Sequence, residues 1–342
     1  MRNYLNYWLG IALLLGNSAW AADGKTNDNP LKGKAFTNPT DIIEMSPAWQ
    51  AKPLTYPEWG KGAVVTIDAD QQFYPLILPM VERYAKENNI VVKSKEGTCG
   101  TAAKDLSDKA IDIGGFCCPP AKSDRLSGLK YHTLGIEAII VIVNADNPID
   151  SLTYDQLQQI YQGKISRWSE LTSKPFKTGA TLGAGKDFID LIGRLHCKQR
   201  PGHWRLLIDN EELFGARLNN VGSIADMISQ VASKPYAIGF EEIWQLERLD
   251  KQHKAKAIMI NGVSPTDVER LAKGDYPLYN TFSLTTWEHE ATRNPHAAKL
   301  VKYVIDNMDE VSSKYGVASA KKLRENGWIF HEEELVGEPP RP

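Results

Sequence analysis

The sequence predicts an α/β protein with two lobes, each built on a mostly parallel sheet flanked by helices. Three observations lead to this fold class. The chain has 342 residues, which is enough for two domains of ordinary size. Short β-branched runs alternate with helical patterns, as is typical of βαβ units and parallel sheets. The run Ala138–Val143 has no polar alternation, so it predicts a strand buried on both faces.

Composition excludes several classes of protein. Hydrophobic residues make up 42% of the chain and charged residues 24%, so the chain is not disordered. Lys plus Arg (40) nearly balance Asp plus Glu (42), and this net charge of -2 argues against nucleic acid or an anionic membrane surface as partner. Four Cys are too few for a disulfide scaffold in so long a chain, so each must be explained separately.

Residues 1–21 predict a signal peptide. Arg2 precedes the apolar run Trp8–Leu15, and Ala19-Trp20-Ala21 supplies the small residues that a signal peptidase reads. The run is too short for a membrane span of about 20 residues. We therefore expect a periplasmic protein cleaved near Ala21, with 39 basic against 42 acidic residues and a net charge of -3. Export also places its thiols in an oxidising compartment.

The remaining elements follow in order along the chain. Residues 22–62 are polar and interrupted by proline, which predicts an irregular N-terminal extension. Lobe 1 is expected over 63–145, with strands at 63–67, 90–92 and 111–114 and helices at 75–88 and 101–109.

Lobe 2 is expected over 146–273, where Thr153 caps a helix that Gly163 ends. A Gly-rich stretch, 178–185, leads into a predicted helix over 187–195, and a helix at 224–231 precedes a strand at 236–240. Residues 274–330 are expected to return to lobe 1 through a strand at 279–285 and amphipathic helices across 295–325, with 331–342 as a solvated C-terminal tail.

A family resemblance rests on residues 152–171. This segment has Leu-Thr at its start, Tyr-Gln-Gly-Lys-Ile at 161–165 and Trp168 before Glu-Leu, and it resembles a signature of periplasmic phosphate-type solute-binding proteins. Segments 231–240, 261–265 and 274–278 match the same family in order. The resemblance implies the type II periplasmic-binding-protein fold, a hinge crossed twice, and a ligand in the cleft between the lobes. It also implies an ABC permease or a membrane sensor kinase as partner.

The same resemblance implies which residues bind the ligand. They lie in loops, two of them Gly-rich turns ahead of helices, where free N–H groups suit an anion or a polar ligand. The candidates are Gln71, Gln72 and Phe73; Thr98, Cys99, Gly100 and Thr101; Cys117 and Cys118; and, in lobe 2, Gly183, Ala184, Gly185 and Lys186.

These loops depart from the phosphate-binding pattern. Cys99 stands at a hydroxyl position, Cys117 at the position of the acidic ligand, and Ala180 near the arginine position. Each charge-assisted hydrogen bond is worth about 1.5–3 kcal/mol, and each 1.4 kcal/mol is a tenfold change in affinity. Even with the charge of Lys186, we expect phosphate to bind poorly.

Sulfur takes the place of the lost groups. Cys99, Cys117 and Cys118 come from lobe-1 loops that should face each other, and Cys197 lies beyond the lobe-2 loop. They are candidate ligands for a thiophilic species such as arsenite or Cu(I), with His196 or His203 as possible additions. The alternative is one or two structural disulfides, of Cys99 with Cys117 or with Cys118, because a bridge between the adjacent pair would be strained. The two interpretations can coexist.

Other functions have less support in the sequence. Oxyanion binding through backbone N–H groups, Gln72 and Lys186, with the cysteines in disulfides, is the main alternative. An enzyme would need Cys197 and His203 as a nucleophile pair, or redox chemistry at Cys117-Cys118, and no motif supplies an orienting acid. The scattered His and Cys lack the spacing of a structural zinc motif, so we expect no structural zinc site. We expect a monomeric binding protein with no catalytic residue, no cofactor and no nucleic-acid partner.

Overall fold

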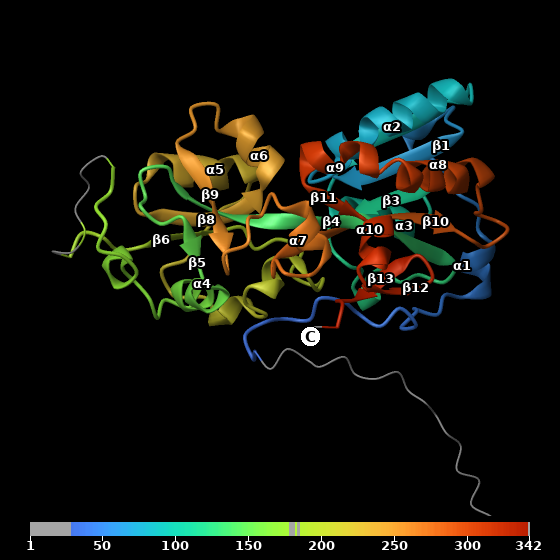
Figure 1. Cartoon of the computed structure of the whole chain (residues 1–342). Helices are drawn as coiled ribbons and strands as arrows, with labels where there is room; N and C mark the ends of the chain where they lie inside the picture. The colour runs from blue at the N-terminus through green and yellow to red at the C-terminus, as the bar shows by residue number, and fades with distance from the viewer. Residues whose placement is uncertain (1–28, 178–181, 183–184, 341–342) are drawn as a thin grey trace, which may run out of the picture.

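Two α/β bodies lie side by side and share one continuous sheet (Figure 1). The computed structural model describes residues 29–177, 182 and 185–340. The expected signal peptide lies outside the described residues. No helix among the described residues is long and apolar enough to cross a membrane.

Lobe 1 is built on three parallel strands in the order β2-β1-β3, which continue into antiparallel β10. Helix α2 begins at Tyr74, with Pro75 in its first turn, and buries an apolar face against this sheet. The elements that precede the second lobe are α1 (Pro47–Ala51), β1 (Val65–Asp70), α2 (Tyr74–Glu87), β2 (Val92–Gly97), α3 (Cys99–Ser107), β3 (Ile113–Phe116) and β4 (Leu129–Asn144).

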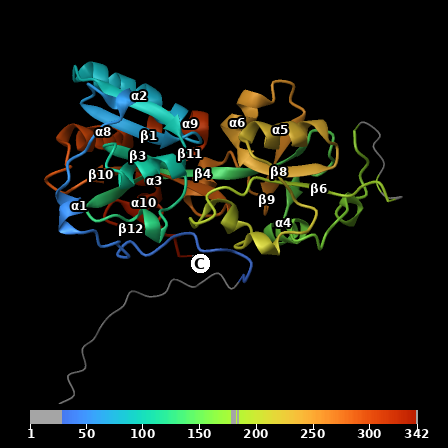
Figure 2. The same cartoon turned by 180° about the vertical axis from the view of Figure 1, so that it is seen from behind.

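Strand β4 joins the two lobes. Its residues 129–138 pair with β10 in lobe 1, and its residues 139–144 pair with β8 and β9 in lobe 2, all antiparallel. Both views show β4 running between the bodies (Figures 1 and 2). The predicted parallel pairing therefore holds in the outer strands of each lobe, whereas the two strands at the junction are antiparallel. The strand predicted at Ala138–Val143 is only the lobe-2 half of β4, since its first half carries polar residues such as Lys130 and Glu137.

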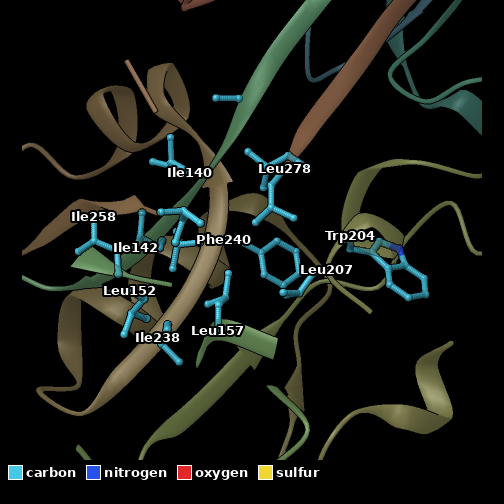
Figure 3. Packing of buried hydrophobic residues seen from close by; sticks show 14 of the residues in the cluster. Ile140, Ile142, Leu152, Leu157, Trp204, Leu207, Ile238, Phe240, Ile258 and Leu278 are labelled. Carbon is cyan, nitrogen blue, oxygen red and sulfur yellow. The ribbon is translucent and has the colours of Figure 1, made fainter. Parts of the chain in front are cut away.

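Lobe 2 packs its helices around β8, the strand next to β4. Figure 3 shows Ile140 and Ile142 of β4 close to Ile238 and Phe240 of β8, with Leu157 of α4 beneath them. The elements of this lobe are β5 (Ser151–Leu152), α4 (Tyr154–Tyr161), β6 (Asp190–Gly193), β7 (Asn219–Asn220), α5 (Ile224–Ser233), β8 (Ala237–Glu242), α6 (Ile243–Leu249), β9 (Ala255–Ile260) and α7 (Val268–Ala272).

One predicted element of lobe 2 was wrong. Residues 187–195 were expected to form a helix, but they contain strand β6, which pairs in parallel with β8 and β7. Leu191, Ile192 and Gly193 are buried in it. A short apolar run buried on both faces cannot be distinguished from a helix by periodicity alone, which explains the error.

The chain then returns to lobe 1. Strand β10 pairs with β3 and β4, and α8 packs on α2, where the rings of Tyr84 and Tyr303 lie 5.2 Å apart. The last elements are β10 (Tyr279–Trp287), α8 (Pro295–Asp306), α9 (Asp309–Tyr315), β11 (Val317–Ser319), α10 (Ala320–Glu325), β12 (Ile329–His331) and β13 (Glu334–Gly337). The region expected as a solvated tail thus includes a hairpin, whose Glu334 forms a buried ion pair with Arg125.

The segment before α1 follows both lobes along one side (Figure 1). Gly33 N–H donates to the carbonyl of Arg205, and Gly202 N–H donates to the carbonyl of Lys34. Further on, Ile43 N–H donates to the carbonyl of Arg125 in lobe 1. The irregular structure expected for 22–62 therefore includes, in its described part, a strap that is hydrogen-bonded to each lobe in turn.

Candidate metal centre

Four cysteines from three separate segments meet at the junction of the lobes. The four Sγ atoms lie within 4.8 Å of one another. The Sγ atoms of Cys99 and Cys117 are 3.1 Å apart, and those of Cys117 and Cys118 are 3.7 Å apart. Cys99, Cys117 and Cys118 are at most 1% exposed, and Cys197 is partly buried. All four are free thiols in this structure.

The parallel sheet of lobe 1 positions three of the thiols. Cys99 is the first residue of α3, directly after β2, and Cys117 follows β3, so both lie at the carboxyl edge of parallel strands. Gly97 is required before the helix, because a Cβ there would lie 2.0 Å from Asp68 Oδ1. Cys99 N–H donates to Asp70 Oδ2 at 2.8 Å, which anchors the start of α3 to the end of β1.

The fourth thiol comes from the other lobe. Cys197 lies in the loop after β6 and has a left-handed backbone, with φ of 51°. Arg200 holds this loop against lobe 1: its guanidinium lies 2.7 Å from Asp124 Oδ1, and its Nη2 donates to the carbonyl of Cys99 at 3.2 Å. Gly202, with φ of 73°, turns the chain where a Cβ would lie 3.0 Å from Pro119. Lobe 2 therefore contributes one ligand to a cluster otherwise built by lobe 1.

The thiols differ in their affinity for protons. Burial raises the pKa of Cys99 and of Cys117 well above the usual value. At Cys118 a hydrogen bond with Cys117 favours the thiolate, but a hydrogen bond with Cys197 and burial oppose it, and the pKa rises to about 11. Hydrogen bonds from the three other thiols lower the pKa of Cys197 well below the usual value. Cys197 is thus the thiol of the cluster that loses its proton most readily.

This arrangement suits a single soft ion. Thiolate sulfur is the preferred ligand of Cu(I) and Zn²⁺, and a Cys₄ set matches the tetrahedral coordination of Zn²⁺. The expectation of no structural zinc site rested only on the spacing of His and Cys along the chain. The cluster has no such spacing, because residues 99, 117 and 197 are brought together by tertiary structure.

The two histidines lie beside the cluster and outside the four-sulfur group. The rings of His196 and His203 are 4.3 Å apart in an edge-to-face arrangement. His196 Nδ1 lies 3.1 Å from the carbonyl of Arg194, and His203 Nδ1 accepts from Trp204 N–H. Burial lowers the pKa of both imidazoles, which disfavours their charged forms. His203 Nε2 faces Gln72 at 3.3 Å and is thus turned toward an amide.

The other candidates of lobe 1 are engaged in the protein's own structure. Gln72 is fully buried and donates to Glu242 in lobe 2. Phe73 is also fully buried, and its ring stacks on Phe282 at 5.0 Å. Gln71 donates its N–H to the carbonyl of Gly97. These contacts place residues 71–73, the loop after β1, in the core and at the junction of the lobes.

Thr98, Gly100 and Thr101 surround Cys99 on the exposed side. Thr98 Oγ1 accepts from Thr101 N–H at 3.1 Å, and Thr98 N–H donates to Thr101 Oγ1 at 2.8 Å. This capping box satisfies two of the free N–H groups that an anion would use. Only Cys99 of this loop points into the buried cluster.

Two of the four lobe-2 candidates belong to the described part of the chain. Gly183 and Ala184 fall outside the described residues. Gly185 and Lys186 are exposed, and the segment that continues from them borders the end of lobe 2 that is remote from lobe 1 (Figures 1 and 2). The next residue, Asp187, is buried and accepts from Ser169 N–H within lobe 2. Among the described residues, no hydrogen bond or ion pair joins Lys186 to the thiols.

Residues that sequence reasoning missed are the charged groups around the cluster. Asp70, Asp124 and Arg200 orient the thiols, but each of them is an ordinary residue in an ordinary loop. Asp70 lies beyond the strand predicted at 63–67, in the loop before Gln71, so the predicted elements did not mark it as part of the site.

The two best-defined hollows lie away from the thiols. A cavity of about 310 Å³ lies between the strap, lobe 2 and the C-terminal segment, and is lined by residues such as Lys32 and Tyr154. A groove of about 800 Å³ lies beside α2 and β2 on lobe 1. Neither is lined by a cysteine, so the thiol cluster lies outside both hollows.

The fold and the site together define a two-lobed α/β binding protein of type II, with its candidate site where the lobes meet. The chain matches the PBP superfamily domain over residues 47–308, more than half of its length, and belongs to that superfamily. It is 24% identical over 246 residues to the phosphate-binding protein PstS of Bacillus subtilis, covering 71% of this chain and 74% of the relative. It is 24% identical over 308 residues to protein SphX of Synechococcus elongatus, covering 80% and 86%.

Solved structures show the same fold. A phosphate ABC transporter substrate-binding protein with bound phosphate from Clostridium perfringens aligns with a TM-score of 0.60 at 17% identity, covering 75% of this chain and 99% of that one. An ABC-type phosphate transport receptor from Vibrio cholerae aligns with a TM-score of 0.55 at 19% identity, covering 74% and 98%. The chain thus shares the fold of these two structures, and its superfamily includes relatives named for phosphate binding.

Proposed function

We propose that this protein is a periplasmic solute-binding protein whose ligand is a thiophilic metal ion, bound by the thiolates of Cys99, Cys117, Cys118 and Cys197. The observation that carries the proposal is the meeting of four sulfurs within 4.8 Å at the junction of the lobes. Each thiol that binds the ion gives up its proton, and bonds to the ion replace the hydrogen bonds between the thiols.

The charges around the centre disfavour phosphate. The two buried guanidinium groups nearby are both paired, Arg194 with Glu241 and Arg200 with Asp124. The two carboxylate oxygens of Asp70 already accept from the N–H groups of Gln72 and Cys99, which an oxyanion would otherwise use. The hydroxyls of Thr98 and Thr101 are used in the helix cap. A cation bound by anionic sulfur has no such conflict.

Binding of the ion by residues of both lobes would distinguish the loaded protein from the unloaded one. Cys197 belongs to lobe 2 and the three other ligands to lobe 1, so a bound ion links the lobes directly. A closed, loaded form distinct from the empty form is what a permease of the ABC class has to recognise, as the family membership implies. The proposed route is export by the N-terminal signal, capture of the ion in the periplasm, and delivery to a permease.

The test is a direct comparison of ligands on reduced, chelator-stripped protein under anaerobic conditions. Zn²⁺, Cu(I), arsenite and phosphate are titrated in turn while Trp fluorescence is recorded and bound metal is measured by mass spectrometry. The proposal predicts one soft ion per chain and no response to phosphate. Tight phosphate binding together with no retained soft ion would refute it.

The disulfide alternative is tested on the same protein. Thiols are counted on unfolded samples prepared with and without prior reduction, before and after loading with Zn²⁺. The proposal predicts that loading protects all four thiols from oxidation. A bridge between Cys99 and Cys117 that resists mild reduction, with no gain in metal binding after full reduction, would favour a structural disulfide.

A further inference from the structure

A second group of buried polar atoms lies where the lobes meet, and it contains oxygen in place of sulfur. Both carboxylate oxygens of Glu137, Oε2 of Glu242, Oδ1 of Asn280 and Oε1 of Gln72 have no hydrogen-bond partner among the described residues. The four side chains are at most 1% exposed. Buried polar atoms in native proteins are nearly always paired, so five unpaired acceptors at one place need an explanation.

The fold brings these four residues together from different elements. Glu137 of β4 and Asn280 of β10 are directly opposite in the antiparallel register, so their side chains share one face of the sheet. Asn280 Nδ2 donates to Glu242 Oε1 at 2.8 Å, and Gln72 Nε2 donates to the same oxygen. The amides of Gln72 and Asn280 therefore hold one oxygen of Glu242, while its other oxygen and both amide oxygens lack a partner.

In the described part of the chain no Lys, Arg or His forms an ion pair with Glu137 or Glu242, although the charge of Arg194 lowers the pKa of Glu242. Arg194, the buried guanidinium nearby, is paired with Glu241 through its Nε at 2.8 Å. Burial raises the pKa of Glu137 and of Glu242, and the charge of Glu241 raises both further. Two buried carboxyl groups with unpaired acceptors around them require either bound protons or a positive ion.

We propose that Glu137, Glu242, Asn280 and Gln72 form a second metal site, specific for a hard divalent cation of the Ca²⁺ type. Carboxylate and amide oxygens are the ligands that Ca²⁺ prefers. Two carboxylates match its charge, and five oxygens supply most of the 6–8 ligands it takes. Because β4 and β10 belong to the junction and Glu242 to lobe 2, the ion stabilises the junction itself. This site is independent of the thiols and of the ligand that they bind.

The test measures Ca²⁺ binding by calorimetry and by thermal unfolding on chelator-stripped, reduced protein. We expect one Ca²⁺ per chain with a Kd below about 1 mM and an unfolding temperature that rises with Ca²⁺ concentration. Glu242→Gln should weaken binding more than tenfold. Glu247→Gln, which changes an exposed acid on the adjoining helix α6, should bind as the parent does.

Three outcomes overturn the proposal. The first is an unfolding temperature of the parent that about 10 mM Ca²⁺ or Mg²⁺ leaves unchanged, which would mean that the carboxyl groups hold protons. The second is undiminished Ca²⁺ binding in Glu242→Gln, which would place the ion on surface carboxylates. Where that variant does not fold, Glu137→Gln takes its place with the same expectation. The third is loss of Ca²⁺ binding in Cys99→Ser, which would mean that the oxygens form no separate site.

Discussion

Replacing Cys197 by serine is expected to weaken Zn²⁺ binding by about 10²–10³-fold. Structural Zn²⁺ sites bind with about 10–16 kcal/mol, and an even division among four thiolates gives about 2.5–4 kcal/mol for each, or two to three powers of ten in affinity. Cys197 is also the thiol whose pKa is lowered, so the substitution removes the sulfur that loses its proton most readily. Serine keeps the size of the side chain but supplies a hydroxyl that stays protonated.

Competition with a chromophoric zinc chelator measures the affinity of parent and variant under reducing, anaerobic conditions. Lys198→Ser is the matched control, because it changes the next residue in the same loop, whose exposed side chain pairs with Glu211. The control should bind as the parent does. A loss of less than about tenfold in Cys197→Ser would show that lobe 2 supplies no ligand. A loss as large in the control would show that the loop, and not the sulfur, is what matters.

Three further predictions concern the scaffold. Arg125→Ala leaves the buried Glu334 without its partner, at 2.6 Å in the parent, and should lower the free energy of unfolding by about 3–5 kcal/mol in urea titrations; no change would mean that the C-terminal hairpin is not anchored there. Thr153→Ala removes the cap that accepts from Gln156 N–H at the start of α4 and should cost about 1 kcal/mol in the same assay. Burial lowers the pKa of His132 from 6.5 to about 4. The unfolded chain therefore takes up a proton first as the pH falls, and stability that is complete above 6.5 is lost by about pH 4, up to about 3 kcal/mol. His132→Gln should remove that part of the pH dependence, and an unchanged slope would contradict it.

The parts of the fold that could be predicted are those in which one local pattern dominates. The cap Thr153 and the stop at Gly163 frame helix α4, as expected. The apolar half of β4 was recognisable, whereas its polar half was not, because those polar side chains find partners only in the folded sheet: Nε2 of His132 lies 2.7 Å from Thr286 Oγ1. Pairing between strands that are distant along the chain is set by tertiary contacts, which a local pattern does not contain.

The candidate site could likewise be predicted only in part. The loops of Cys99 and Cys117 were expected to face each other, because both follow strands of one parallel sheet. Cys197 lies in the cluster because the nearby Arg200 pairs with Asp124, and these two residues are 76 positions apart in the chain. Nothing in the local sequence predicts that contact. Lys186 was aligned with a cage residue of the family, but the segment around it does not lead toward lobe 1.

The most direct measurement is X-ray absorption at the zinc edge of protein loaded with one Zn²⁺. The proposed centre predicts four sulfur neighbours at about 2.3 Å, with no nitrogen or oxygen in the inner shell. A shell of oxygen and nitrogen, or one with two sulfurs or fewer, would contradict binding by the four cysteines that the two lobes bring together.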